Sequence, residues 1–173
     1  MSTGKLGSLA AAAIVGGTLV GCGGDGGEPT PSAHSIRTPV VRVVDGDTIV
    51  ASVDGAEEYV RYIGVDTPET VKPGTPVQCY GPQASEENHR LVEGRTVRLV
   101  FDRERRDDYG RLLAYVYTGV GQGAESPRFV NAALVRDGYA RTLTIAPNTA
   151  HAPLLAHLQA RAGKAGRGLW GAC

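Results

Sequence analysis

Residues 60–70 read V-R-Y-I-G-V-D-T-P-E-T, and this segment carries the strongest structural signal in the chain. Side chains alternate between the two faces of a strand, so the first half is predicted to place Arg61 beside Ile63 and Val65. Aliphatic neighbours can cover the stem of an arginine while its charged head remains polar. The segment therefore predicts a strand that holds a guanidinium on an otherwise apolar face.

Two carboxylates follow this strand directly. Asp66 and Glu69 are separated by Thr67 and by Pro68, which fixes the turn. Such a turn can hold a hard cation next to a bound anion, because carboxylate oxygens are the ligands that such cations prefer. The alternative interpretation is a solvated turn that carries the same residues without chemistry.

The rest of the chain predicts a small barrel. Turn signals and β-branched runs predict five short strands, at 40–44, 49–53, around Arg61, at 96–101 and at 111–117. Helical spacing predicts helices at 82–93, 131–136 and 151–164. This order predicts a mainly β, α+β fold, namely a five-stranded OB-fold barrel with about three helices; the turn spacing does not fit parallel βαβ winding.

Several side chains are given places by this pattern. Asn131 is expected to cap the second helix, and Glu87 is expected to face solvent on the first. Leu154 and Leu158 are expected to lie on the apolar face of the last helix. Trp170 is expected to fold back as a plug of the core.

Two further polar groups stand at predicted strand ends. Asp47 opens the second strand with the same parity as Ile49, which predicts an inward-facing carboxylate that needs a partner. Arg111 opens the last strand with the parity of Leu113 and Tyr115. Strand ends at one rim of a barrel converge, so these groups are expected to meet those of residues 60–70 in one site.

The chemistry of that set indicates phosphodiester hydrolysis. Asp47, Asp66 and Glu69 suit a Ca²⁺-type oxygen site rather than zinc, since no cysteine or histidine lies nearby in the sequence. Arg61 and Arg111 suit a phosphate, because each offers a planar fork to its oxygens. Cation and guanidiniums would stabilise the charge at phosphorus, and Glu69 would orient or deprotonate a water molecule.

The N-terminus predicts export. Residues 1–22 combine Lys5 with an apolar stretch too short to span a membrane, and they end in Leu-Val-Gly-Cys, similar to a bacterial lipobox with Cys22 as the lipidated residue. An ordinary secretory signal with an incidental cysteine is the alternative. Residues 23–37 read as a flexible tether and residues 38–173 as the domain. We expect a location on the outer face of the cell membrane, or secretion.

The other two cysteines predict a disulfide. Outside the reducing cytoplasm, an even pair in a small domain favours pairing of Cys79 with Cys173, and two free thiols are the alternative. The four histidines are scattered without metal-ligand spacing and are expected at the surface. The formal net charge of the chain is zero, so composition alone makes no electrostatic case for a nucleic-acid partner.

Six motifs in order resemble the thermonuclease family, the staphylococcal-nuclease-like proteins. They are V-D-G-D-T (44–48), R-Y-I-G-V-D-T-P-E-T (61–70), Y-G-P-Q-A-S (80–85), Y-G-R-L-L-A-Y-V-Y (109–117), V-N-A-A-L-V-R (130–136) and L-W (169–170). The resemblance implies an OB-fold core and Ca²⁺-dependent cleavage of DNA and RNA that leaves 3′-phosphates. Single-stranded DNA, RNA and denatured DNA would be the substrates of a monomer that meets the membrane only through its lipid.

The resemblance also implies roles for individual residues. Asp47 and Asp66 would be metal ligands, with Thr67 offering its backbone carbonyl. Arg61 and Arg111 would grip the scissile phosphate, Glu69 would be the general base, and Tyr109 would contact the terminal phosphate of a bound nucleotide.

Three departures from the best-known member of that family affect substrate binding. Asp108 stands where that member has a lysine, no tyrosines flank the base near residues 141–147, and the loop between Tyr117 and Phe129 is longer. With a net charge near zero, these departures predict weaker and less salt-sensitive binding of nucleic acid. They also put base stacking in doubt.

The leading hypothesis is a surface-tethered nuclease that degrades extracellular nucleic acid. The competing hypothesis is a non-catalytic OB-fold module that binds nucleic acid or protein, which the loss of a site carboxylate or arginine would have favoured. A third interpretation keeps the fold and makes the charges structural salt bridges.

Overall fold

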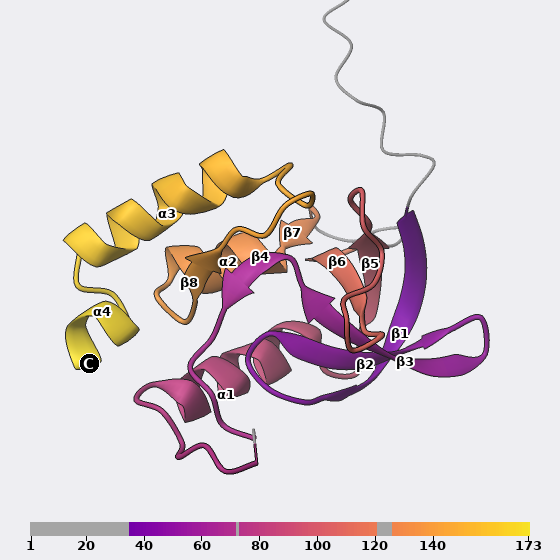
Figure 1. Cartoon of the computed structure of the whole chain (residues 1–173), viewed down its shortest axis with the longest axis horizontal. Helices are drawn as coiled ribbons and strands as arrows, with labels where there is room; N and C mark the ends of the chain where they lie inside the picture. Colours follow the sequence, from indigo (N-terminus) through magenta and orange to yellow (C-terminus); the bar gives the residue numbers. More distant parts are fainter. Residues whose placement is uncertain (1–34, 72, 121–125) are drawn as a thin grey trace, which may run out of the picture. The chain divides into compact units, whose positions relative to one another are not determined.

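Five strands close into a barrel (Figure 1). They are β1 (Ser35–Val43), β2 (Thr48–Val53), β3 (Ala56–Tyr62), β5 (Thr96–Val100) and β6 (Leu112–Thr118). They pair antiparallel in the order β3-β2-β1-β5-β6, and a parallel pairing of β3 with β6 closes the ring. A two-residue strand, β7 (Arg128–Phe129), extends the sheet at β6. The predicted five-stranded barrel is confirmed.

The structure is a computed structural model that describes residues 35–71, 73–120 and 126–173. The predicted signal segment 1–22, Cys22 and most of the predicted tether lie outside these residues. Within the described ranges, no helix has the length and the apolar character needed to cross a membrane.

Four helices accompany the barrel: α1 (Gly81–Val92), α2 (Val130–Arg136), α3 (Ala152–Lys164) and the short α4 (Leu169–Ala172). Two three-residue strands, β4 (Gly64–Asp66) and β8 (Arg141–Leu143), form a separate antiparallel pair. Proline in the first turn suits the start of both α1 and α3, because those positions need no intrahelical donor. In Figure 1 the β4–β8 pair lies between the barrel and helix α3. Strand β4 begins two residues after the end of β3, so the pair starts at the end of a barrel strand.

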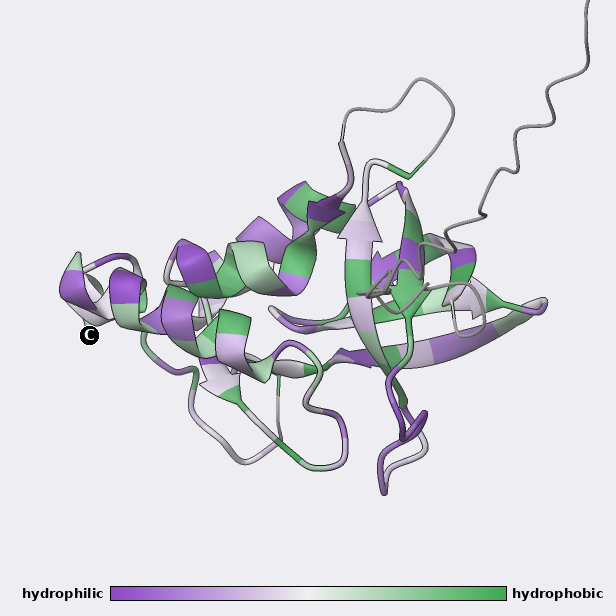
Figure 2. Ribbon diagram, turned by 90° about the horizontal axis from the view of Figure 1, so that it is seen from above, coloured by the Kyte–Doolittle hydropathy of each residue, from purple (hydrophilic) through white to green (hydrophobic). Residues whose placement is uncertain are grey.

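The core is formed by the side chains that point to the inner face of each strand. Figure 2 shows hydrophobic and hydrophilic positions alternating along the strands of the barrel. Ile49, Val60 and Leu99 are fully buried inside it. Tyr62 is buried with them, and its hydroxyl donates to Asn88 Oδ1 at 2.9 Å, so its polar end is satisfied on helix α1. The packed interior gives the strand ends a rigid support.

Two predicted boundaries are wrong. Strand β1 begins at Ser35, which pairs with Val100, so residues 35–37 belong to the barrel and not to the tether. The alternation of residues 60–70 also breaks at Gly64, which adopts φ +78. A Cβ at Gly64 would lie 2.6 Å from Leu155 Cδ1, so the chain turns there from β3 into the separate strand β4.

Other predicted placements are also wrong. Asn131 does not cap α2: it is fully buried, accepts from the Val116 N–H at 2.9 Å and donates to the Ile63 carbonyl at 2.8 Å. Glu87 is buried, because Arg90 one turn later pairs with its carboxylate. Asn131 therefore connects the barrel to the β3–β4 turn, and Glu87 belongs to the packed side of α1.

The last two helices also bury different residues from those predicted. Leu155 is buried on α3 while Leu154 is 44% exposed, and Leu158 packs against the core as expected. Leu169, not Trp170, fills the core at α4. The exact rotation of α3 depends on where β4 and α2 meet it, which helical spacing does not specify.

His151 was expected at the surface, but its ring is half-buried among aromatic side chains. Its ring lies 4.5 Å from that of Tyr115 and 4.9 Å from that of Phe129, measured between centroids. Burial lowers the pKa of His151, and the carboxylate of Asp102 opposes that effect. This histidine therefore belongs to an aromatic cluster at the start of α3.

Candidate active site

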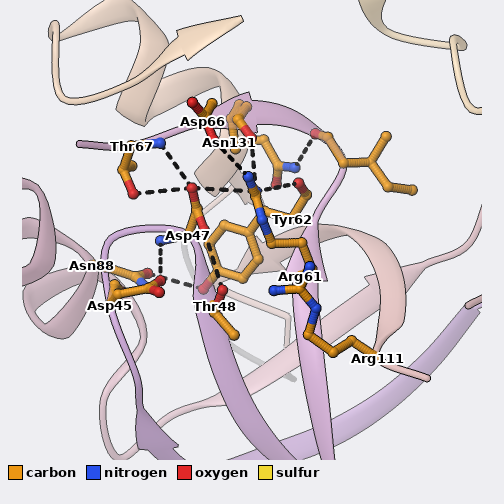
Figure 3. A network of polar contacts seen from close by, with 12 residues as sticks. Asp45, Asp47, Thr48, Arg61, Tyr62, Asp66, Thr67, Asn88, Arg111 and Asn131 are labelled. Atoms are coloured by element: carbon orange, nitrogen blue, oxygen red, sulfur yellow. Dashed lines mark hydrogen bonds and ion pairs between the residues drawn. The ribbon is translucent and has the colours of Figure 1, made fainter. Parts of the chain in front are cut away.

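The end of β3, β4 and the turns that precede β2 and β6 surround a cavity of about 80 Å³ (Figure 3). We call it the central cavity. Its lining residues are Asp45, Asp47, Thr48, Arg61, Asp66, Thr67, Pro68, Glu69 and Arg111. The polar residues that the sequence placed at strand ends thus meet at one rim of the barrel.

Asp47 is held in place by the bend before β2. Its backbone N–H donates to Asp45 Oδ1 at 3.0 Å, and its carbonyl accepts from the Tyr62 N–H at 2.9 Å. Gly46 allows this bend to pack against Thr67, since a Cβ at Gly46 would lie 2.7 Å from Thr67 Oγ1. The bend and the D-T-P-E-T turn are therefore in direct contact.

The carboxylate of Asp47 is 7% exposed and has several partners. Its Oδ2 accepts from the Thr67 N–H at 2.8 Å and from Thr67 Oγ1 at 3.0 Å. Its Oδ1 accepts from Thr48 Oγ1 at 3.2 Å. Arg61 Nη1 lies 3.2 Å from Oδ2 and supplies the opposite charge that a buried carboxylate needs.

The guanidinium of Arg61 forms ion pairs with two carboxylates. Its second nitrogen, Nη2, donates to Asp66 Oδ1 at 3.0 Å, while Nη1 also donates to the Val65 carbonyl at 2.7 Å. Figure 3 shows Asp47 and Asp66 on the same side of this guanidinium. In this structure a cationic side chain therefore holds together the two acids that were predicted to share a metal ion.

Two acids at this rim have raised pKa values. Burial raises the pKa of Asp45 to about 6, and repulsion from Asp47 contributes. Burial also raises the pKa of Asp66, with Asp47 and Glu69 adding to the effect and Arg61 opposing it. Both carboxyl groups therefore hold their protons more tightly than in water, mainly because they are partly withdrawn from solvent.

Glu69 is held by its own turn. Its Oε1 accepts from the backbone N–H groups of Thr70 at 2.8 Å and Val71 at 2.9 Å. Gln78 bonds the backbone of Glu69 twice: its Oε1 accepts from the Glu69 N–H, and its N–H donates to the Glu69 carbonyl, both at 2.9 Å. Sequence reasoning missed Gln78, although its position immediately before Cys79 was a signal.

Cys79 is joined to Cys173 by a disulfide with a Cα–Cα distance of 6.0 Å. The bond connects the segment that holds Glu69 to the C-terminus after α4. It thus fastens the far end of the chain beside the central cavity.

Arg111 is oriented by Asp107, which the sequence analysis did not single out. Its Nε donates to Asp107 Oδ2 at 2.7 Å, and its backbone N–H donates to Asp107 Oδ1 at 3.0 Å. The guanidinium remains 33% exposed. Tyr109 stands beside it, 86% exposed, with its ring centroid 5.4 Å from Arg111 Cζ.

The expected convergence of three carboxylates on one ion does not occur in this form of the site. Asp47, Asp66 and Glu69 all line the central cavity. Across the described ranges, however, no three Asp, Glu, His or Cys side chains are placed to hold a metal ion together. Glu69 points its Oε1 at its own turn, and Asp47 and Asp66 both bind Arg61.

A larger hollow of about 270 Å³ adjoins the central cavity and shares Arg61 and Arg111 with it. Leu143 and Ile145 form an apolar part of its wall, and Asp107 and Asp108 are among its acidic residues. Residues 141–147 contain no tyrosine and contribute these two aliphatic side chains to the wall, whereas Tyr62 and Tyr109 line the hollow elsewhere. Sequence reasoning did not single out Leu143 or Ile145.

Comparison with known proteins identifies the family of the chain. Residues 59–172 match the family described as "Staphylococcal nuclease homologue". The chain belongs to this family. It is 42% identical over 139 residues to a thermonuclease of Staphylococcus hyicus, covering 80% of this chain and 78% of that protein. It is 45% identical over 131 residues to a thermonuclease of Staphylococcus intermedius, covering 76% of this chain and 74% of the relative.

A third relative is the endonuclease YncB of Bacillus subtilis, 45% identical over 116 residues, which cover 66% of this chain and 52% of that protein. With these relatives the chain is a hydrolase of the nuclease class. The predicted family resemblance and enzyme class are confirmed.

Proposed function

We propose that this nuclease is a Ca²⁺-dependent phosphodiesterase that hydrolyses DNA and RNA, with single-stranded and denatured DNA among its substrates, and leaves 3′-phosphates. One observation supports the proposal most strongly: two guanidiniums and four carboxylates line a single cavity, and two of these carboxylates pair with the same guanidinium. Guanidiniums and hard-cation ligands together are what phosphodiester cleavage requires.

The donor set fits calcium. The carboxylates of Asp47 and Asp66 both line the central cavity, and both already pair with one cationic group, the guanidinium of Arg61. Together with the Thr67 backbone carbonyl they would hold the ion, and water or phosphate oxygens would complete its shell. When bound, Ca²⁺ supplies the positive charge that offsets the negative charge developing at the phosphate.

The chain's own residues would carry out the other parts of the reaction. Arg111 and Arg61 donate hydrogen bonds to the non-bridging oxygens, with Arg61 exchanging its carboxylates for phosphate as substrate arrives. Glu69 orients a water molecule and accepts its proton. The water oxygen forms the new P–O bond, the P–O5′ bond breaks, and the departing 5′-oxygen takes up a proton from solvent.

Export and anchoring form a second part of the proposal. The lipobox-like sequence that ends at Cys22 supports lipid attachment, with the protein held at the outer face of the cell membrane or secreted. The Cys79–Cys173 disulfide supports an oxidising compartment. We propose a monomer whose membrane contact is the lipid alone.

The test is nuclease activity on denatured DNA and on RNA, with Ca²⁺ and then with a chelator. Chelation should abolish cleavage, and re-addition of Ca²⁺ should restore it. Asp47→Asn and Glu69→Gln should each lose at least about 10²-fold in kcat. Glu86→Gln, an exposed carboxylate on α1, is the matched control and should cleave normally. Full activity in chelator, or wild-type activity of both site variants, would support a different mechanism, and binding without cleavage would support the non-catalytic alternative.

A further inference from the structure

A third hollow of about 190 Å³ adjoins the central cavity, and Arg111 is not among its lining residues. It shares Asp66, Thr67 and Pro68 with that cavity, and Arg141 lies in its wall. We call it the Arg141 hollow. Neither the family resemblance nor the polar groups at the strand ends assign a function to it.

Arg141 is placed there by the backbone. It opens β8, and its Cα partner in the β4–β8 pair is Asp66, a predicted metal ligand. A residue one strand away from Asp66 necessarily lies within reach of whatever binds at Asp66. The backbone position of Arg141 is therefore fixed by its pairing with Asp66.

The guanidinium of Arg141 is oriented without being neutralised. It stacks over the ring of Trp170, with its Cζ 4.4 Å from the ring centroid. Within the described residues no carboxylate forms an ion pair with it, whereas Arg61, Arg90, Arg106, Arg111 and Arg136 each have one. Stacking uses the face of the guanidinium and leaves its edge, which carries the N–H donors, directed outward in the ring plane.

The large hollow and the Arg141 hollow each share lining residues with the central cavity, and they share none with each other. The large hollow joins the central cavity through Arg61 and Arg111, and the Arg141 hollow joins it through Asp66 and Thr67. A polynucleotide cut at the central cavity must leave it in two directions, because the scissile phosphate is internal to the strand. The large hollow, with its apolar wall and acidic residues, suits a nucleoside, and the Arg141 hollow presents a cation and suits a phosphate.

We infer that Arg141 is a substrate-binding residue that holds a phosphate next to the scissile one, in the Arg141 hollow and not in the large hollow. The ligand class is the phosphodiester backbone of a single-stranded polynucleotide. This inference rests on the proposed phosphodiesterase function. It also explains how a chain with no net charge can bind a polyanion. The guanidinium of Arg141 lies beside the cleavage position, and no carboxylate among the described residues forms an ion pair with it.

A structural role predicts different behaviour. If Arg141 only fastened α4 through Trp170, its replacement would weaken all substrates equally and would leave their charge dependence unchanged. If it holds a phosphate, its replacement should matter only for substrates that carry the charge at that phosphate. The two roles are separated by changing the protein and the substrate together.

The experiment uses three oligonucleotides with one defined cleavage position. One is unmodified, and in the others a neutral methylphosphonate replaces the phosphate on one side or the other of the scissile bond. Steady-state kcat/KM is measured for the wild type, Arg141→Gln, Arg141→Lys and the control Arg161→Gln, an exposed arginine on α3 that lines none of the three hollows.

For the wild type and Arg161→Gln, one of the two neutral substitutions should lower kcat/KM by about fivefold, as expected for a partly exposed charge contact. Arg141→Gln should lose the same factor on the unmodified strand and lose nothing further on that modified strand. Arg141→Lys should recover part of the loss. The plot of log kcat/KM against log salt concentration should be less steep in Arg141→Gln, with a slope smaller in magnitude by about 1.

Equal losses on all three substrates, or identical behaviour of Arg141→Gln and Arg161→Gln, would overturn the inference. Neither result would touch the proposed function, because the wild type would still cleave the unmodified strand. Absence of Ca²⁺-dependent cleavage by the wild type would instead overturn the proposed function.

Discussion

Removal of the disulfide should cost this domain a large part of its stability. Cys79 and Cys173 are 94 residues apart in sequence, so the bond closes a loop that spans most of the described chain. On the chain-entropy relation a loop of this length contributes about 4–5 kcal/mol by restricting the unfolded state. For a domain of this size that corresponds to a fall of about 10–15 °C in Tm. This loss is a large part of the free energy of unfolding of a typical domain, so we expect the folded state of Cys79→Ser/Cys173→Ser to be only marginally stable.

The chain offers a convenient assay for this change. Its single tryptophan, Trp170, is half-buried in α4, three residues before the disulfide, so its fluorescence reports on the cross-linked end. Far-ultraviolet circular dichroism reports on the barrel and the longer helices. Urea titrations followed by both signals should give coincident transitions in the oxidised protein, and a larger dependence on urea in the variant, whose unfolded state is more expanded.

Wild-type protein under reductant is the matched control and should unfold at the same urea concentration as the double serine variant. A loss smaller than about 1 kcal/mol would refute the reasoning, because it would mean that the chain-entropy relation does not apply to this loop. Non-coincident transitions in the oxidised protein would show that α4 detaches before the barrel unfolds. Activity should also fall on reduction, since Gln78, which holds the backbone of Glu69, precedes Cys79.

Two further predictions concern the rim and the aromatic cluster. Arg111→Gln should lower kcat by at least about 10²-fold. It should leave the free energy of unfolding within about 1 kcal/mol of wild type, because the ion pair of Arg111 with Asp107 is partly exposed. A kcat equal to that of the wild type would remove Arg111 from the catalytic groups. Burial holds the pKa of His151 below its ordinary value of about 6.5, so the unfolded chain binds the proton more readily than the folded one. The contribution of His151 to the free energy of unfolding should therefore be fully present above about pH 6.5 and should be lost as the pH drops through the lower folded pKa. Urea unfolding at several pH values measures this dependence, and His151→Phe should flatten it. An unchanged pH profile in the variant would assign the slope to other groups.

The family resemblance and the barrel could be predicted from the sequence because both depend on local patterns. The alternation in each strand, the Asp54-Gly55 turn and Pro82 at the start of α1 are readable from residues a few positions apart. Residue type likewise identified the acids and arginines at the strand ends, since an Arg or Asp at an inward strand position needs a partner wherever the chain folds.

The tertiary structure decided which partner each of these groups has. Arg61 binds both Asp47 and Asp66, and Arg111 is held by Asp107, four residues earlier in the turn before β6. Asn131 fastens the barrel to the β3–β4 turn where a helix cap was predicted. These outcomes depend on which distant segments approach one another and how much water they exclude. Short-range periodicity carries no information on either, and for the same reason the three adjoining hollows became visible only in the folded chain.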